Sequence, residues 1–438
     1  MTEPQTTIDR RTALKLIGAV GALPVVAPAP GAAQTQTDIQ PFTIRVSGTE
    51  LDDLHRRLEH TRWPADATGE PWSMGTDRAY LQQLVAYWKD EYDWRAQEAA
   101  LNRLDHYTTM INGYKIHFIH QRSSNPSAVP LIMTHGYPGT FWEMLPSVPA
   151  LVNPSAHGGT AADSFHVIVP SLPGYGFSGE PLEDFTPGTV PDLWIKLMDK
   201  LEYERFGTYG SDWGSQMGSG IAAREPDRVI GVTTPGQPPR TRVEPRTAEE
   251  RKYWESMDRY TAEETAYQLI QGTKPQSLAY GLTDSPAGLA GWVVEKLRAW
   301  SDCRGNPENT FTKDQILTLV SIYWHTGSIG TAVRIYYSAG MFRTPPAPRT
   351  VGLTLENLRA RRPSQRQPRA SGRRVPEGYS DFYGITSRER PPRSLVEEVP
   401  DHVTLWSHHE TGGHFPAAEE PGLLVEDLRT FFRPLRTA

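Results

Sequence analysis

The stretch Phe206-Gly207-Thr208-Tyr209-Gly210-Ser211-Asp212-Trp213-Gly214-Ser215 decides how this chain folds. Its first half is typical of a buried strand, and its second half is typical of the start of a helix. The glycines between the two halves indicate a very tight turn. A turn of this kind forces its central residue into strained backbone geometry, so only small side chains fit two positions to either side.

The positions of the glycines identify the central residue. Centred on Asp212, the flanking positions hold Gly210 and Gly214, whereas centred on Ser211 they would hold two large aromatic residues. The resulting small-x-Asp-x-small pattern is that of a nucleophile elbow with a carboxylate where serine usually stands. The alternative is that Asp212 is only the N-cap of the following helix. The rest of the chain has to decide between these two interpretations.

Bulk composition narrows the class of protein. The chain has 438 residues and a formal net charge of −6, so its charge gives no support to a role in nucleic-acid binding. Its single cysteine, Cys303, excludes an internal disulfide framework and a metal site built from several cysteines. The length suits one large domain with additions, or two domains.

The first 33 residues differ from the rest of the chain. Arg10-Arg11 precede an apolar run over 16–26, and small residues continue to Ala33. This order predicts a twin-arginine export signal, and therefore a periplasmic or extracellular protein. An amphipathic N-terminal helix or a disordered tail is the alternative. The apolar run is too short for a permanent membrane span, and no other membrane segment is apparent.

The order of elements predicts an α/β fold with a mostly parallel sheet. Thr49, with Asp52 three residues later, predicts a helix start, and Asn112-Gly113 predicts a hairpin. Short apolar strands then alternate with helices, which places functional loops at the carboxyl edge of the sheet. The predicted parts are an N-terminal helical and hairpin extension (34–127), a first core part (128–246), a helical lid followed by a poorly ordered loop (247–374), and a second core part (375–438) in which the sheet resumes near 403–406.

An aspartate nucleophile needs further groups around it. It forms an ester with carbon, and a base must then activate water to hydrolyse that ester. His414 follows the last predicted strand, where this fold places its histidine, although His408 and His409 lie nearby. Two backbone amides, those of Trp213 and Tyr137, are predicted to form the oxyanion hole. Pro138 after Tyr137 also suggests a cis peptide bond that would aim the Tyr137 amide.

The motifs together resemble one known family. The chain is similar to microsomal-type epoxide hydrolases, which have an α/β-hydrolase fold with an N-terminal domain of their own. The resemblance implies conversion of an epoxide to a vicinal diol through an aspartyl ester, with a small apolar epoxide and water as substrates and with no metal or cofactor. It covers most of the chain outside the signal and residues 343–400, and it rests on Ile39-Gln40-Pro41-Phe42, Thr61-Arg62-Trp63-Pro64, Tyr92-Asp93-Trp94-Arg95, His135-Gly136-Tyr137-Pro138-Gly139, Leu172-Pro173-Gly174-Tyr175-Gly176-Phe177-Ser178, Gly210-Ser211-Asp212-Trp213-Gly214-Ser215, Thr273-Lys274-Pro275, Asp284-Ser285-Pro286-Ala287-Gly288-Leu289-Ala290 and Gly412-Gly413-His414-Phe415.

The resemblance also implies roles for individual residues. Asp212 matches the family nucleophile and His414 the base. Tyr267 and Tyr336 match two lid tyrosines that donate hydrogen bonds to the epoxide oxygen, with Tyr337 as the alternative to Tyr336. A tyrosine suits this role because it is a neutral donor at pH 7.

The chain departs from the family at the acid that orients the histidine. Ile385 occupies the acid position, and Tyr383 stands where the family has proline. Glu389 is the predicted substitute, with Asp381 as the alternative. Two other functions remain open: a haloalkane-type dehalogenase that uses the same nucleophile with Trp213 as a halide donor, and a catalytically impaired hydrolase fold that binds a ligand.

Overall fold

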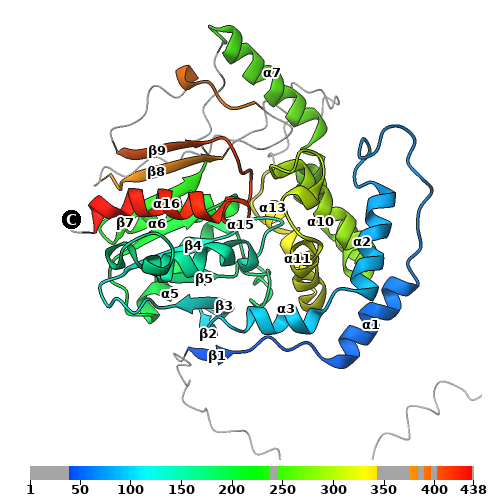
Figure 1. Cartoon of the computed structure of the whole chain (residues 1–438), viewed down its shortest axis with the longest axis horizontal. Helices are drawn as coiled ribbons and strands as arrows, with labels where there is room; N and C mark the ends of the chain where they lie inside the picture. Colours follow the sequence, from blue (N-terminus) through cyan, green and yellow to red (C-terminus); the bar gives the residue numbers. More distant parts are fainter. Residues whose placement is uncertain are drawn as a thin grey trace, which may run out of the picture. The chain divides into compact units, whose positions relative to one another are not determined.

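The computed structural model of the protein describes residues 39–236, 242, 244–342, 374–382, 389–395 and 402–436. The predicted signal, Tyr383, Ile385 and nearly all of residues 343–374 therefore lie outside the described residues. The described strands form one sheet in the order β1-β2-β3-β5-β4-β6-β7-β8-β9 (Figure 1). They are β1 (Gln40–Phe42), β2 (His106–Ile111), β3 (Tyr114–Gln121), β4 (Val129–Thr134), β5 (Phe165–Pro170), β6 (Phe206–Gly210), β7 (Val229–Pro235), β8 (Glu377–Phe382) and β9 (Val403–His409).

The sheet is mostly parallel. Strands β5, β4, β6, β7, β8 and β9 run parallel to one another, whereas β1, β2 and β3 are antiparallel additions at one edge. Strands β2 and β3 form the hairpin predicted at Asn112-Gly113. Every residue of β5 and β6 is buried, as expected for strands covered on both faces. The parallel sheet predicted from the sequence is thus confirmed.

Helices cover both faces of the sheet. Successive residues of a strand point to opposite faces. In β6, Gly207 packs against Phe432 of α16 (Pro421–Phe432), whereas the next residue, Thr208, packs against Gly218 of α6 (Trp213–Arg224). Helices α6 and α16 therefore lie on opposite faces. Two further helices, α4 (Val148–Val152) and α5 (Val190–Lys200), complete these layers.

A helical lid lies between β7 and β8 in the sequence. Figure 1 shows α10, α11 and α13 grouped beside the sheet, with α1 and α2 on the side away from it. Tyr87 donates to Asp314 (2.9 Å), and Tyr92 lies 3.1 Å from the Thr318 hydroxyl, so the N-terminal helices brace the lid. The helices of these two regions are α1 (Gly48–Glu59), α2 (Arg78–Asp90), α3 (Trp94–Leu101), α7 (Ala248–Glu263), α8 (Ala266–Thr273), α9 (Pro275–Asp284), α10 (Pro286–Trp300), α11 (Lys313–Thr326), α12 (Ile329–Ala332) and α13 (Ile335–Ser338).

Two local expectations differ from the structure. Helix α1 is capped by Ser47, which forms a capping box with Glu50, and not by Thr49. The sequence offers the same Ser/Thr-x-x-acid spacing twice in this region, and the structure uses the earlier one. The sheet also resumes before residue 403, because β8 pairs with both β7 and β9.

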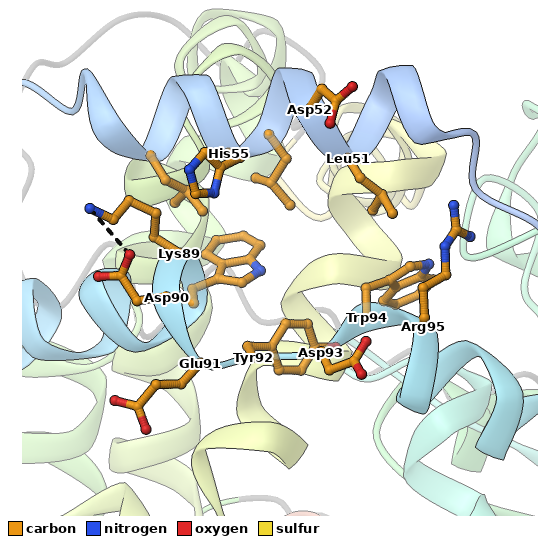
Figure 2. A pocket seen from close by; sticks show the side chains of 13 residues that line it. Leu51, Asp52, His55, Lys89, Asp90, Glu91, Tyr92, Asp93, Trp94 and Arg95 are labelled. Atoms are coloured by element: carbon orange, nitrogen blue, oxygen red, sulfur yellow. Dashed lines mark ion pairs between the residues drawn. The ribbon is translucent and has the colours of Figure 1, made fainter.

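A surface groove of about 470 Å³ lies between α1 and the turn that joins α2 to α3 (Figure 2). Apolar side chains such as Trp88 and Trp94 contribute to its walls, and an ion pair between Lys89 and Asp90 (3.3 Å) lies at its rim. All of its lining residues fall between Leu51 and Arg95, and none of them is predicted for catalysis. Among the described residues, no helix has the length and apolar character needed to cross a membrane.

Candidate active site

The elbow has the geometry that its glycines predict. Asp212 lies between β6 and α6 with φ 51° and ψ −118°, a conformation that side chains rarely adopt. A Cβ on Gly210 would lie 2.2 Å from the backbone of Gly214, and one on Gly214 would lie 1.9 Å from the carbonyl oxygen of Thr134. The Asp212 side chain makes no capping hydrogen bond to α6, although it occupies the N-cap position. The strained backbone therefore presents this carboxylate at the end of β6, and the carboxylate does not cap α6.

One oxygen of the carboxylate is held by the loop after β4. The Tyr137 amide donates to Asp212 Oδ1 (3.0 Å), and the Tyr137-Pro138 peptide bond is cis. Gly136 makes room for this contact, because a Cβ there would lie 2.2 Å from the Cβ of Asp212. The loop after β4, called the oxyanion-hole loop for its predicted role, is therefore in direct contact with the elbow.

The second carboxylate oxygen faces a histidine. His414 Nε2 lies 3.7 Å from Asp212 Oδ2, a separation typical of a catalytic base before substrate binds. The two competing histidines contact other carboxylates: His408 lies 3.0 Å from Asp381, and His409 lies 2.7 Å from Asp427. The structure therefore places His414 beside the elbow.

Two lid tyrosines pack against the aromatic residues that flank the carboxylate. Tyr267 on α8 and Tyr336 on α13 are buried, and their ring centroids are 5.6 Å apart. Burial raises the pKa of both hydroxyls well above 10, and the charge of Asp212 adds to this effect, so both remain protonated donors at neutral pH. Tyr337 is 40% exposed, whereas Tyr336 contacts the indole ring of Trp213 (5.2 Å).

Sequence reasoning missed a buried carboxyl group behind the elbow. Ser211 Oγ donates to Glu143 Oε1 (2.7 Å), and the Gly136 amide also donates to this side chain. Burial raises the pKa of Glu143 to about 8, so the group is protonated at neutral pH. Glu143 thus bridges the elbow and the oxyanion-hole loop without adding a second negative charge beside Asp212. Its signal in the sequence is an acidic residue within an otherwise apolar segment, Phe141–Leu145.

A second missed carboxyl group holds the histidine loop. Glu419 Oε1 accepts from the Phe415 amide, and its Oε2 accepts from the Asp302 amide, both at 2.8 Å. Desolvation raises its pKa to about 7. Phe415 follows His414, and Asp302 follows the end of α10. Glu419 therefore joins the loop that carries His414, called the base loop, to the lid.

The predicted acid partner lies against α7. Lys252 pairs with Glu389 (3.0 Å), and the Glu389 amide donates to Ser256 Oγ (3.0 Å). The alternative, Asp381, contacts His408 and lies 3.5 Å from Arg390. The acid that orients His414 stays a prediction, because Ile385 and its neighbours lie outside the described residues.

The described residues contain no group of three or more His, Cys, Asp or Glu side chains that could hold a metal ion. They do bring together a carboxylate, an imidazole, an oriented backbone amide and two neutral phenols. This set can attack an electrophilic carbon, donate to a leaving oxygen and activate water.

Comparison with known proteins agrees with the architecture. Residues 39–144 match the epoxide hydrolase N terminus family, and residues 129–254 match the alpha/beta hydrolase fold family. The fold and the elbow thus define an α/β hydrolase with aspartate at the nucleophile position.

Its relatives identify the family. Epoxide hydrolase 1 of Sus scrofa is 31% identical, over 92% of this chain and 90% of its own. The structure of Aspergillus niger epoxide hydrolase has a TM-score of 0.73 at 27% identity, covering 91% of this chain and 97% of that one. The juvenile hormone epoxide hydrolase structure from Bombyx mori has a TM-score of 0.72 at 28% identity, covering 91% and 94%. The chain belongs to the microsomal-type epoxide hydrolase family, and it is an enzyme of the hydrolase class.

Proposed function

We propose that this protein hydrolyses a small apolar epoxide to a vicinal diol through an ester on Asp212. One observation carries the proposal: the Asp212 carboxylate contacts an oriented amide, lies 3.7 Å from His414, and is close enough to two buried tyrosines to influence their pKa values. The relatives are named as epoxide hydrolases, which supports the same substrate class here.

In the first step, Asp212 Oδ2 attacks an epoxide carbon. Oδ1 is already engaged by the Tyr137 amide, which leaves Oδ2 as the attacking oxygen. The C–O bond of the epoxide breaks, and its electrons pass to the oxygen, which takes a proton from Tyr267 or Tyr336. Because both phenols are neutral and desolvated, their hydrogen bonds to the developing charge are strong.

In the second step, His414 takes a proton from water, and the hydroxide attacks the ester carbonyl carbon. The negative charge then forms on Oδ1, which already accepts from the Tyr137 amide, and the Trp213 amide is the proposed second donor. Collapse breaks the bond between the Asp212 carbonyl carbon and Oδ2, and Oδ2 leaves as the second hydroxyl of the diol with the proton from His414. The proton lost when the Asp212 carboxyl group ionises again restores the tyrosine.

A single turnover in ¹⁸O-labelled water tests this route. With enzyme in excess over styrene oxide, the first diol should contain no ¹⁸O, because its new oxygen comes from Asp212, and the label should appear in the protein. Labelled diol in that first turnover would show direct attack by water and would contradict the ester route. Halide release from chloroalkanes without epoxide turnover would instead identify a dehalogenase.

The acid that supports His414 can be tested through the two half-reactions. We propose Glu389 as the acid that supports His414, because a short insertion before Pro391-Pro392-Arg393 would shift the loop that holds the family acid position. If Glu389 has this role, Glu389→Gln should slow ester hydrolysis and leave ester formation unchanged, whereas Asp381→Asn should change neither.

An active enzyme differs from an impaired one in the lifetime of the ester. An ester that never decays in the unmodified protein, seen by intact mass after epoxide addition, would favour the impaired ligand binder.

We also propose export by the twin-arginine route, on the basis of residues 9–33 alone. These residues lie outside the described part of the structure. Replacing Arg10 and Arg11 together by lysine should retain the protein in the cytoplasmic fraction. Unchanged fractionation would contradict the proposal.

A further inference from the structure

A buried lysine lies beside the lid tyrosine. Lys296 on α10 is only 4% exposed, and its Nζ lies 4.7 Å from the centroid of the Tyr267 ring and 5.4 Å from the Trp300 ring. Its ammonium also pairs with Glu295 (2.6 Å). Burying a charge is unfavourable unless it is compensated, and here two aromatic rings of the site provide part of the compensation.

The hydroxyl of Tyr267 is arranged to donate. Gln268 Nε2 donates to the Tyr267 oxygen (2.9 Å), which occupies an acceptor position and leaves the hydroxyl proton free to point elsewhere. The Tyr336 hydroxyl is also within hydrogen-bonding range of Tyr267. The hydroxyl of Tyr267 therefore lies beside that of Tyr336 and feels the charge of Asp212, while its ring contacts Lys296.

We propose that Lys296 is a positioning residue that strengthens Tyr267 as a hydrogen-bond donor. A phenol ring becomes richer in electrons as its hydroxyl gives up its proton, and a cation over the ring face is attracted more strongly to that richer ring. The attraction therefore increases as the epoxide oxygen becomes negative, which lowers the barrier to ring opening. This inference rests on the proposed epoxide hydrolase function.

The contact with Trp300 allows a competing route. The Trp300 ring also lies against the imidazole of His414, with centroids 4.9 Å apart. If Lys296 acted through Trp300, its removal would change ester hydrolysis, which uses His414, and not ester formation, which uses Tyr267. The two half-reactions therefore distinguish the two routes.

The first experiment measures single-turnover rate constants with styrene oxide. Lys296→Met removes the charge but keeps an unbranched side chain, whereas Lys296→Arg keeps the charge. Lys296→Met should slow ester formation by about 2- to 30-fold, the range expected for losing a cation–π contact, and Lys296→Arg should restore most of the rate. Lys296→Gln serves as a second neutral variant. Rate constants per active site do not depend on the fraction of protein that folds.

The second experiment is a double-mutant cycle. The loss caused by Lys296→Met should disappear in a Tyr267→Phe background, because no hydroxyl proton remains to be strengthened, and it should persist in a Tyr336→Phe background. An equal loss in both backgrounds would show a merely structural lysine and overturn the inference. So would a loss confined to ester hydrolysis. A protein that forms no diol at all would instead contradict the proposed function.

Discussion

The proposed nucleophile and the proposed base are held by two different parts of the molecule. Asp212 follows β6, a central strand. Gly214, two residues later, packs against the backbone of neighbouring β4. His414 follows β9, a strand at the edge of the described sheet, and its amide donates to the Trp300 carbonyl at the end of α10 (2.8 Å). The sheet thus positions Asp212, the proposed nucleophile, whereas the lid helps to position His414, the proposed base. The two half-reactions should therefore respond to different kinds of damage.

The largest effect is expected from removing the nucleophile. Asp212→Ala leaves no oxygen to attack the epoxide, so diol release from styrene oxide should fall by at least about 10⁴-fold. Asp227→Ala, at an exposed position shortly after α6, is the matched control and should retain activity. Substantial turnover by Asp212→Ala would remove Asp212 from the mechanism.

The next largest effect is expected from removing the base. His414→Gln should still form the ester but hydrolyse it about 10²- to 10⁴-fold more slowly, so the adduct should accumulate in intact-mass measurements. The imidazole of His408 contacts Asp381, so His408→Gln should behave like the unmodified protein. Accumulation in His408→Gln but not in His414→Gln would exchange the two assignments.

Two glycine substitutions test whether the sheet holds Asp212 and the lid holds His414. A Cβ on Gly214 meets the sheet backbone, so Gly214→Ala should lower the free energy of unfolding by about 1–3 kcal/mol or more. A Cβ on Gly413 would lie 2.6 Å from the Trp300 carbonyl oxygen, so Gly413→Ala should displace the base loop and slow mainly ester hydrolysis.

The control for both glycine variants is Gly422→Ala in α16, where no atom of the described residues lies within 4 Å of the added Cβ. Denaturant unfolding and single-turnover kinetics provide the two measurements. If Gly413→Ala and Gly214→Ala change the same quantities in the same proportion, sheet and lid do not divide the site as inferred.

The pH dependence of stability should reflect one buried carboxyl group near the site. Burial raises the pKa of Glu143 from 4.5 to about 8 in the folded protein. Between these values the unfolded chain binds fewer protons than the folded one at this site, so the contribution of Glu143 to the free energy of unfolding falls as the pH rises from about 4.5 to 8.

Glu143→Gln removes this titration and keeps a side chain that can accept from Ser211. The variant should gain stability relative to the unmodified protein at pH 8 compared with pH 5, as measured by thermal unfolding at both values. Parallel pH profiles for the two proteins would show that Glu143 does not titrate in this range.

The sequence predicted those features that depend on local sterics or on regular alternation of elements. The register of the elbow follows from the collision between positions 210 and 214, which any similar turn would have. The parallel sheet follows from short apolar strands separated by helices. Both inferences needed only residues that are close in the sequence.

Features that depend on distant packing were not predicted. Lys296 looks like a surface charge in the sequence, and the apolar neighbours of Glu143 indicate burial but not its place behind the elbow, so only the tertiary structure shows that both are buried beside the site. Strand β8 carries few apolar residues and is defined by pairing with β7 and β9, which are distant in the chain. The Thr49 prediction was wrong because Ser47 offers the same capping pattern.

The hydrogen bond between the His414 amide and the Trp300 carbonyl has a consequence for the timing of the reaction. Any swing of the C-terminal end of α10 away from the sheet would carry the imidazole with it. A lid opened to admit a bulky molecule would thus withdraw the base from Asp212, and hydrolysis would wait until the lid returned. Substrate entry and ester hydrolysis would then depend on the same movement of the lid. Redesigning the lid for larger substrates would therefore also change the rate of ester hydrolysis.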